Sequence, residues 1–553
     1  MAFTCSSLNG RMEPARYLFP DSGRLLNMGT FVNPSNERFR VALNSGIYVD
    51  KSGLIEYINS VLNTKEAFIC NSRPRRFGKS TAADMLVAYY SRGCDSRAMF
   101  SSLEAGRLPS FEKNLNAFDV IRVDIQWCLG PAGGKDKVVF FLTESIIREL
   151  GECYPEIVSS ESTSLPLVLD RIRNETGRKF IVIIDEWDVL IRDDSNADTQ
   201  NGYVDFLRNL FKGGEEYIAL AYLTGILPVL REKTQSALNN FEEYTMLSPG
   251  PLARYFGFNE DEVKNLCLRY NRDFNEVERW YDGYRLGDYH VYNPRSVVSV
   301  MLRGEYSSYW TKTGSYQVVT PLIDLNYDGL KDTVLVLLAG KEVRIDAEGF
   351  ENNPRKISCK DDVLTYLIHL GYLAYDRKRK NAFVPNEEIR QGLWMAVNKS
   401  TSDKLIGFCR DSENLLEATI RGDGRTVASA IEKIHSRYTS VIQYNDENSL
   451  ASVLTVAYLS SLKYYLNAIR ELPSGKGYAD FVYLPLPENM GMYPALVIEL
   501  KWDKSAESAI TQIKERKYTE NIKEYTGNIL LVGINYDKDT KKHECTIEQI
   551  EKS

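Results

Sequence analysis

The feature that most constrains the fold is a run of five apolar residues, 180–184 (FIVII), that ends in two acidic residues, Asp185 and Glu186. A strand that is apolar on both faces is typical of the middle of a parallel sheet, where helices cover both sides. Other strand-like segments alternate with segments of helical periodicity, which predicts a parallel α/β sheet. The expected strands are 65–71, 121–125, 180–184 and 217–223, and the expected helices are 80–90, 138–150, 165–174 and 204–211.

The chain is too long for a single hydrophobic core. It has 553 residues, and at roughly 150 residues per domain this indicates three or four domains. We expect the parallel α/β domain over 28–250 and a helical lid region over 251–330, where residues 256–270 have an Asn cap and amphipathic spacing. Residues 331–402 suit a small winged-helix-like module with a hairpin near LAYDRKRKNAFVPN, and a generic helical spacer fits them equally well. A second α/β domain is expected over 403–553.

The first 27 residues show no clear periodicity. A second methionine, Met28, opens the segment MGTFVNPSNERFRVALNSGIYVDKS. We expect that the biological start is Met28 and that residues 1–27 are a non-native or disordered extension.

Residues 71–81 (NSRPRRFGKST) lie between an expected strand and an expected helix, and Gly78, Lys79 and Ser80 have the order of the end of a Walker A loop. Backbone N–H groups at the helix start would hold phosphate oxygens, Lys79 would reach the β- and γ-phosphates, and the Ser80 hydroxyl would ligate Mg²⁺. Arg73 stands where the generic pattern has its first glycine. The candidate nucleotide-binding residues here are Arg75, Arg76, Phe77, Gly78, Lys79, Ser80 and Thr81.

The strand 180–184 supplies the second half of this expected ATP site. Asp185 would hold Mg²⁺ and Glu186 would polarise the attacking water, although acidic residues at strand ends also serve as helix caps. Thr224 follows the strand 217–223, where a polar side chain would sense the γ-phosphate. The arginines that would neutralise charge in the transition state are Arg75 and Arg76, whereas we interpret two others as surface residues, namely Arg208 and Arg231.

A separate constellation lies near the C-terminus. The segments GKGYAD (475–480) and VIELK (497–501) are strand-like, and side chains two apart on a strand share a face, so Glu499 and Lys501 point the same way. If the two strands pair, Asp480 meets them. Two such carboxylates would hold one or two Mg²⁺ ions beside a phosphodiester, and Lys501 would position the attacking water. The same E-x-K pattern also occurs at solvated strand edges.

Further residues extend this expected metal site. Gln512 and Tyr518 lie on the next expected helix, 506–519, and resemble a Q-x-x-x-Y element of RecB-like nucleases, although their spacing is two residues longer. Glu447 and Glu471 precede the core, and either is a candidate extra metal ligand, with Glu447 preferred.

Several motifs follow one another in order, and together they are similar to one family. They are YVDKS (48–52), SRPRRFGKS (72–80), IIDEWD (183–188), YLTG (222–225), LNNF (238–241), WYDGYR (280–285) and VYNP (291–294). This ordered set resembles the bacterial predicted AAA-ATPase family that carries a C-terminal PD-(D/E)XK nuclease domain. The resemblance spans residues 28–540 and implies a P-loop, AAA-like ATPase domain over 28–250 and a restriction-endonuclease-like domain over 403–553. The family shares RPRRFGKS, so the missing first glycine is a family trait.

Two of these motifs have structural interpretations. Residues 281–284 (YDGY) are most simply a turn in which Gly283 supplies a positive φ. Asn293 and Pro294 are typical of a turn or a helix start.

Composition narrows the classes of partner and compartment. A net charge of -7 argues against a protein that coats nucleic acid nonspecifically, but it is compatible with a local basic groove. The nine cysteines are dispersed and form no C-x-x-C pair, which indicates reduced thiols in a cytoplasmic protein without a zinc site. The longest apolar stretch, 217–230, is too short to span a bilayer, so no membrane association is expected.

Three functions are compatible with these features. The first is an ATP-binding and ATP-hydrolysing protein that cleaves nucleic acid with Mg²⁺, with DNA favoured over RNA. The second is a nucleotide-dependent switch that binds nucleic acid or a protein partner without cleavage. The third is an ATPase that remodels proteins, which no sequence feature favours. Many AAA-type ATPases form rings, so a homo-oligomer is an open expectation, although no trans-acting arginine is evident.

Overall fold

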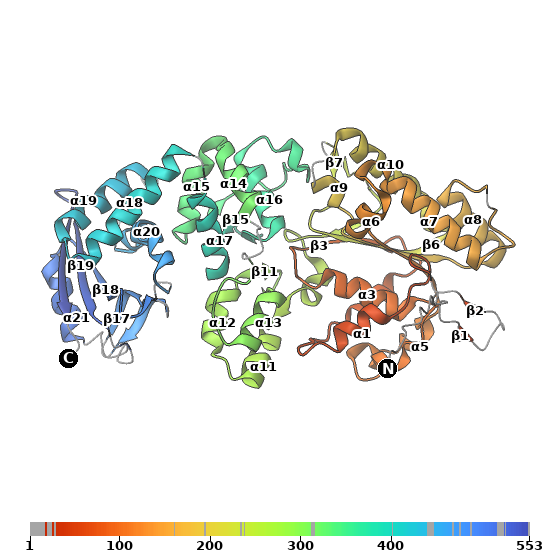
Figure 1. The fold of residues 1–553 in the computed structure, drawn as a ribbon, viewed down its shortest axis with the longest axis horizontal. Helices are drawn as coiled ribbons and strands as arrows, with labels where there is room; N and C mark the ends of the chain where they lie inside the picture. Colours follow the sequence, from red (N-terminus) through yellow and green to blue (C-terminus); the bar gives the residue numbers. More distant parts are fainter. Residues whose placement is uncertain are drawn as a thin grey trace, which may run out of the picture.

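The computed structural model is elongated, with an N-terminal α/β domain at one end, a C-terminal α/β domain at the other, and mainly helical regions between them (Figure 1). It describes residues 17–18, 25–26, 29–159, 161–192, 195–232, 235–236, 238–310, 316–400, 402–438, 447–466, 469–474, 477–486, 489–516, 525 and 527–550. Within residues 1–27 only a short pair, β1 (Tyr17–Leu18) and β2 (Leu25–Leu26), is described, and the expectation about Met28 lies outside the described residues.

The N-terminal domain is built on a five-stranded sheet in the order β4-β5-β6-β3-β9, and every neighbouring pair is parallel. The four expected strands are confirmed. The bounds are β3 (Phe68–Ser72), β4 (Asp119–Asp124), β5 (Phe180–Asp185), β6 (Ile218–Gly225) and β9 (Glu242–Tyr244). All six residues of β5 are buried, as the apolar run predicts for a central strand.

Helices cover both faces of this sheet. Alternate residues of β5 face opposite sides: Val182 and Ile184 join the core beneath α7, α8 and α10, whereas Ile181 and Ile183 join the core beneath α2 and α3. The helices, which include all four that were expected, are α1 (Glu37–Leu43), α2 (Leu54–Val61), α3 (Lys79–Tyr90), α4 (Arg97–Phe100), α5 (Phe111–Asn114), α6 (Ile125–Ala132), α7 (Val138–Cys153), α8 (Leu165–Thr176), α9 (Val189–Arg192) and α10 (Ala197–Phe211).

The lid region begins where the sequence predicts a helix. Asn259 and Glu262 form a capping box at the start of α11 (Glu260–Tyr270), which satisfies two backbone N–H groups at that end. α12 (Phe274–Tyr281) and α13 (Pro294–Arg303) follow. A small antiparallel sheet in the order β10-β12-β11 lies beside them, with β10 (Phe258–Asn259), β11 (Tyr284–Leu286) and β12 (Tyr289–Tyr292).

The next module combines helices with the expected hairpin. β14 (Ala374–Asp376) and β15 (Asn381–Phe383) pair antiparallel, and β13 (Val343–Arg344) completes a three-stranded sheet in the order β13-β15-β14. The helices are α14 (Tyr316–Leu325), α15 (Leu330–Leu338), α16 (Lys360–Leu370) and α17 (Glu387–Asn398). The module is therefore not a purely helical spacer, and we keep the expected name, winged-helix-like module, for it.

The C-terminal domain has a mixed five-stranded sheet in the order β16-β17-β18-β19-β20, in which only β18 and β19 are parallel among the described pairs. The strands are β16 (Ile469–Ser474), β17 (Gly477–Tyr483), β18 (Ala495–Trp502), β19 (Ile529–Asp537) and β20 (Lys542–Ile550). The helices are α18 (Asp403–Ile420), α19 (Gly424–Tyr438), α20 (Glu447–Ala457) and α21 (Ala506–Glu515).

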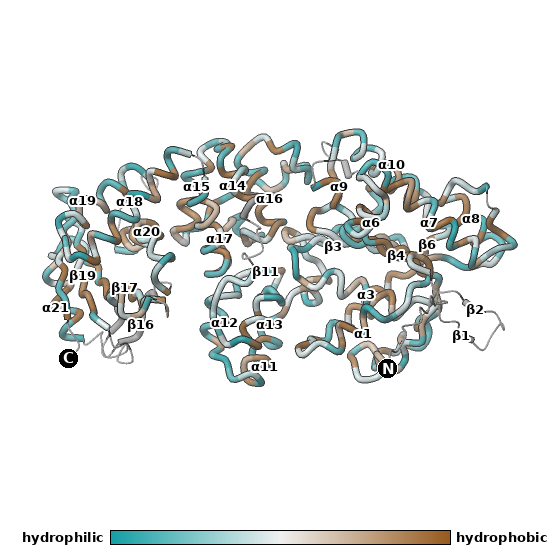
Figure 2. Tube along the Cα trace, in the orientation of Figure 1, coloured by the Kyte–Doolittle hydropathy of each residue, from teal (hydrophilic) through white to brown (hydrophobic). Residues whose placement is uncertain are grey.

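One apolar core runs through all four of these parts. It includes Phe77 of the loop before α3, Tyr284 of β11, Leu367 of α16, Phe408 of α18 and Ile498 of β18. Hydrophobic residues also concentrate along the strands of the N-terminal sheet (Figure 2). Within the part of the chain that the structure describes, no helix has the length and apolarity needed to cross a bilayer.

The turn at Gly283 brings the lid against the winged-helix-like module. Its φ is +106°, as the sequence predicts, and a Cβ here would lie 1.9 Å from the carbonyl oxygen of Pro385. Gly283→Ala should therefore lower the apparent free energy of unfolding by about 3 kcal/mol, because it combines backbone strain with a clash. Urea denaturation followed by circular dichroism measures this loss.

Gly287→Ala is the matched control, since Gly287 has a φ of +65° but open space where a Cβ would lie. Its expected cost is about 1 kcal/mol, from backbone strain alone. Equal losses for the two variants would contradict the close-approach explanation.

Candidate functional site

The loop between β3 and α3 forms a cradle at the carboxyl end of the sheet. Gly78 precedes α3 with a φ of +88°, and a Cβ on it would meet nothing within 4 Å. Arg76 also has a positive φ, of 70°. Positive-φ residues next to a helix start turn successive N–H groups toward one point, which suits an anion.

Arg73, at the position of the missing glycine, is fully buried. Its Nη1 donates to the carbonyl oxygen of Tyr244 at 2.9 Å, and its guanidinium lies 5.7 Å from the ring centre of Phe256. Burial lowers the pKa of Arg73 to about 10. The side chain therefore braces the loop from beneath against β9 and the segment that follows it.

Lys79 and Asp185 meet at the carboxyl ends of the central strands. Lys79 is buried, and its Nζ donates to the carbonyl oxygen of Pro74 at 3.0 Å. Burial lowers the pKa of Lys79 and raises the pKa of Asp185 to about 6. Arg122 on β4 reaches within 3.9 Å of the Asp185 carboxylate. Sequence reasoning missed Arg122, although its place inside a buried strand was a signal.

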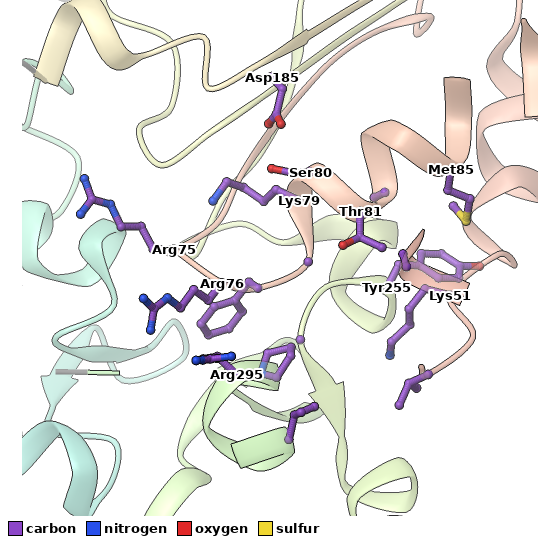
Figure 3. Close-up of a pocket in the computed structure, with 18 of the residues that line it drawn as sticks. Lys51, Arg75, Arg76, Lys79, Ser80, Thr81, Met85, Asp185, Tyr255 and Arg295 are labelled. Carbon is purple, nitrogen blue, oxygen red and sulfur yellow. The ribbon is translucent and has the colours of Figure 1, made fainter. Parts of the chain in front are cut away.

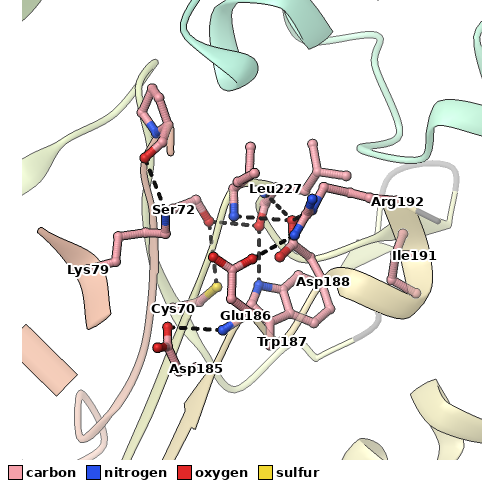
Figure 4. Close-up of polar contacts among 12 residues, drawn as sticks. Cys70, Ser72, Lys79, Asp185, Glu186, Trp187, Asp188, Ile191, Arg192 and Leu227 are labelled. Atoms are coloured by element: carbon pink, nitrogen blue, oxygen red, sulfur yellow. Dashed lines mark hydrogen bonds and ion pairs between the residues drawn. The ribbon is translucent and has the colours of Figure 1, made fainter. Parts of the chain in front are cut away.

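Glu186, the expected water-polarising residue, is held by an arginine. Arg192 Nη2 lies 2.6 Å from Glu186 Oε2, and Arg192 Nε lies 2.7 Å from Asp188 Oδ2 (Figure 4). Asp188 is itself fixed by the backbone N–H of Leu227 at 2.8 Å. Arg192 follows Asp188 by four residues on one helical turn, and this spacing could have identified it.

A cavity of about 990 Å³ opens over these groups. Figure 3 shows Arg75, Arg76, Lys79, Ser80 and Asp185 around it, and Arg295 beside Arg76. Its volume is at the upper end of small-molecule sites. All expected nucleotide-binding residues from 75 to 81, with Asp185 and Glu186, line it. Residues in its lining that sequence reasoning missed include Lys51, Asp124, Arg192 and Arg295.

Part of the cavity lining is apolar. Ile47, Tyr48 and Val49, from the segment that includes the YVDKS motif, contribute to it together with Phe258 and Val298 of the lid region. Apolar side chains of this kind suit a flat aromatic group such as a nucleobase. The motif thus acquires a role that the sequence alone did not suggest.

Lys51 ties the same motif to the lid. Its Nζ lies 2.7 Å from both carboxylate oxygens of Glu262 and donates to the carbonyl oxygen of Arg254 at 3.0 Å. The lid is therefore fixed at this edge of the cavity.

One predicted residue, Thr224, lies outside the cavity lining, and two arginines are interpreted as surface residues. Thr224 is fully buried opposite Asp185 in the β5–β6 register, and it does not line the cavity. Arg208 pairs with Asp205 at 3.2 Å on α10, away from the cavity lining. Arg231 begins β7 (Arg231–Glu232), and its side chain lies outside the described part of the structure.

In the C-terminal domain the expected acidic and basic residues meet. Phe481 of β17 pairs with Ile498 of β18 in an antiparallel ladder, so Asp480 comes opposite Glu499. Asp480 Oδ2 accepts the backbone N–H of Leu500 at 2.7 Å. Lys501 Nζ donates to Glu499 Oε1 at 2.9 Å. The structure therefore brings Asp480, Glu499 and Lys501 together.

Glu499 has one carboxylate oxygen left over. Gln512 Nε2 of α21 also donates to Oε1, whereas Oε2 is buried without a hydrogen-bond partner among the described residues. Burial and the charge of Asp480 raise the pKa of Glu499 to about 7. An unsatisfied buried carboxylate oxygen beside a second carboxylate fits a divalent cation.

The remaining expected ligands are less defined. Glu447 begins α20, and its negative charge also acts on Glu499. Among the described residues, however, no three acidic, histidine or cysteine side chains form a metal-binding group. Tyr518 and the side chain of Glu471 lie outside the described residues.

Comparison with known families agrees with this geometry. Residues 37–234 match the family model described as predicted AAA-ATPase, and residues 445–545 match the PD-(D/E)XK nuclease superfamily. The chain joins an AAA-ATPase-like domain to a PD-(D/E)XK nuclease-superfamily domain. Both families are named for enzymes. The cavity at Lys79 therefore belongs to the AAA-ATPase-like domain, and the Asp480–Glu499–Lys501 group belongs to the nuclease-superfamily domain.

Individual relatives add little beyond this. A protein described as "Uncharacterized protein in vnfD 5'region", from Azotobacter chroococcum mcd 1, is 25% identical over 289 residues, which cover 50% of this chain and 52% of the relative. The chain thus spans about half the length of this relative. The ORC2 protein of Aeropyrum pernix, solved as ADPNP-ADP complexes, aligns with 66% of this chain and 92% of its own at 12% identity, with a TM-score of 0.29, which decides nothing about fold or function.

The raised pKa of Glu499 in the nuclease-superfamily domain has a consequence for stability. Below the ordinary pKa of 4.5 the carboxyl is protonated in both the folded and the unfolded chain, and the buried group costs the folded state no charge. As the pH rises through about 7 the folded chain must bury a charged carboxylate, and the free energy of unfolding falls. Without metal, Glu499→Gln should therefore raise the apparent free energy of unfolding by about 2 kcal/mol at pH 8 and hardly at all at pH 4.5. Thermal denaturation in EDTA at both pH values measures this difference.

The exposed Glu515 on the neighbouring helix provides the control, because Glu515→Gln removes a carboxylate without removing a buried charge. A gain for Glu499→Gln that is the same at both pH values would contradict the assignment.

Proposed function

We propose that the chain binds and hydrolyses ATP in the AAA-ATPase-like domain and cleaves nucleic acid with Mg²⁺ in the nuclease-superfamily domain. The observation that carries the proposal is the convergence of Asp480, Glu499 and Lys501 on paired strands, with Glu499 Oε2 unsatisfied. The cavity lined by Lys79, Asp185 and Glu186 supports the ATP half.

In the ATP site, each group has a task that follows from its position. The N–H groups around Gly78 and the Lys79 ammonium bind the phosphates, and the low-dielectric surroundings of Lys79 strengthen that attraction. Asp185 and the Ser80 hydroxyl would hold Mg²⁺, which supplies charge neutralisation on the phosphates when bound. Glu186 orients water, and the 2.6 Å ion pair with Arg192 fixes its carboxylate. Thr224 remains a candidate sensor of the γ-phosphate.

In the nuclease site, Asp480 and Glu499 would hold the metal, which lowers the pKa of a bound water and stabilises charge on the scissile phosphate when present. Lys501 lies within 2.9 Å of Glu499, so its ammonium orients that carboxylate and offsets negative charge on the reacting phosphate. Gln512 donates a second hydrogen bond to the same Glu499 oxygen. Glu447 and Tyr518 remain candidate additions to this site.

The finer parts of the proposal have indirect support. DNA is favoured over RNA on the family resemblance, and a homo-oligomer is proposed on the same ground. A cytoplasmic location is supported by the cysteines, since the eight that the structure describes are all free thiols.

A nucleotide-dependent switch that binds without cleavage is the second candidate. The observation in its favour is the ion pair between Glu186 and Arg192, because a carboxylate oxygen that an arginine occupies is not available to a water. In this alternative, ATP binding alone changes the conformation, and the C-terminal domain only binds nucleic acid or a protein partner.

Lys79→Ala tests the ATP half. Removal of the buried ammonium should lower ATP turnover by at least about 100-fold, as loss of a preorganised charge does elsewhere, measured as phosphate release. Glu186→Gln should keep ATP binding and lose turnover. Lys65→Ala, a change of an exposed lysine before the same strand, is the control and should leave turnover intact. Turnover in Lys79→Ala at the wild-type rate would exclude this site.

A panel of plasmid, single-stranded DNA and RNA, with Mg²⁺ or Mn²⁺ and with or without ATP, tests the nuclease half. Glu499→Ala and Lys501→Ala should each reduce cleavage by about 100-fold or more, whereas Glu515→Ala should not. Lys79→Ala reports whether cleavage depends on ATP. Binding without cleavage in every condition would favour the switch.

A further inference from the structure

A buried carboxyl group joins the lid to the winged-helix-like module. Glu388, in the first turn of α17, is 1% exposed. Its Oε1 accepts the backbone N–H groups of Tyr309 and Trp310, each at 2.6 Å, and its Oε2 accepts the Ser296 hydroxyl at 2.6 Å. One side chain thus satisfies three donors from the preceding region of the chain.

The place of Glu388 is fixed by its own backbone. Asn386 caps α17 by accepting the N–H of Ile389 at 3.0 Å and donates to the carbonyl oxygen of Asp282 at 2.6 Å. The backbone of Gly283 lies against Pro385, so closely that a Cβ on residue 283 would not fit. Because the start of α17 is held on both sides, the carboxyl of Glu388 acts as a rigid anchor for the groups that it binds.

One of the anchored groups adjoins the lining of the nucleotide cavity. Ser296 follows Arg295 in α13, and Arg295 lines the cavity beside Arg76 (Figure 3). Neither arginine has a carboxylate within ion-pair distance among the described residues, although Glu388 attracts Arg76 at longer range. Two guanidinium groups that are close together repel each other unless an anion lies between or beside them.

We infer that Glu388 is a positioning residue for the terminal phosphate of ATP. It holds α13 on the winged-helix-like module so that Arg295 faces Arg76 across the phosphate end of the cavity. This inference rests on the proposed ATP site and deepens it. The matched AAA-ATPase region ends at residue 234, so both Glu388 and Arg295 lie beyond it.

Glu388 also gives the nucleotide a route to the rest of the chain. Because the Ser296 hydroxyl donates to Glu388, a shift of α13 toward a bound γ-phosphate would carry α17 with it. The carboxyl thus joins α13 and α17 into one unit.

The test compares ATP and ADP in Glu388→Ala. Loss of the anchor should raise the KM for ATP about tenfold, by weakening one charge-assisted contact, while the Kd of ADP changes by less than about twofold. Arg295→Ala should show the same selectivity. In an Arg295→Ala background, Glu388→Ala should add no further change, because both substitutions remove the same contact.

Two milder variants keep the test decisive if Glu388→Ala does not fold. Ser296→Ala removes one of the three hydrogen bonds and should raise the KM for ATP by about threefold. Glu388→Gln keeps an acceptor for the two N–H groups and can donate to Ser296, so it should restore most of the ATP selectivity. Asp362→Ala is the matched control: Asp362 is a buried carboxylate of the same module that binds the Ser358 hydroxyl and N–H away from the cavity. It should shift ATP and ADP equally or not at all.

Equal shifts for ATP and ADP in Glu388→Ala and Ser296→Ala, or independent effects of positions 388 and 295, would overturn the inference. A wild-type chain that binds no ATP would instead overturn the proposed ATP site. The two failures are thus distinguishable in the same set of measurements.

Discussion

The structure depends on carboxylates that the fold takes out of water. Asp185, Glu388 and Glu499 are all buried, and burial is the largest cause of their raised pKa values, which lie at about 6, 7 and 7. A carboxylate in such surroundings is stabilised when a cation approaches it. Two of the three belong to the candidate sites, and the third binds the helix that carries Arg295. The desolvation of these carboxylates therefore favours the binding of cations at both candidate sites.

Packing joins these places more tightly than the order of the domains suggests. Phe77 contacts the ring of Tyr284, with ring centres 5.3 Å apart, and the Tyr284 hydroxyl donates to the carbonyl oxygen of Gly371 at 2.6 Å. The same apolar core continues through the helices to Phe481, the neighbour of Asp480 on β17. Close-packed interiors change by discrete rearrangement and not by gradual bending. The lid, the winged-helix-like module and the C-terminal sheet are therefore joined by one continuous hydrophobic core.

Sequence patterns predicted the elements whose cause is local. The apolar run 180–184, the Asn259 cap and the turn at Gly283 depend on neighbouring residues, and the structure has all three. The shared face of Glu499 and Lys501 followed from the period of a strand, whereas the meeting with Asp480 depended on the pairing of two strands, which the structure has. Glu388 could not be assigned in this way, because its partners are set by how helices dock, whereas the spacing of Asp188 and Arg192 is local and was overlooked. Glu388 meets Ser296 from 92 positions away in the chain. The nucleotide-site pattern likewise did not reveal that the YVDKS segment contributes to the lining of the cavity.

Arg73 shows how a departure from a generic motif changes the behaviour of a loop. A glycine at this position would leave the backbone flexible. The buried guanidinium instead donates hydrogen bonds to the carbonyl oxygens of Ser72 and Tyr244 and so restrains the loop. A stiff loop loses its conformational entropy during folding. The phosphate site is therefore preorganised, and binding of a phosphate costs less entropy. Discrimination between incoming phosphates then falls to the exposed rim, where Arg75 and Arg76 remain free to adjust.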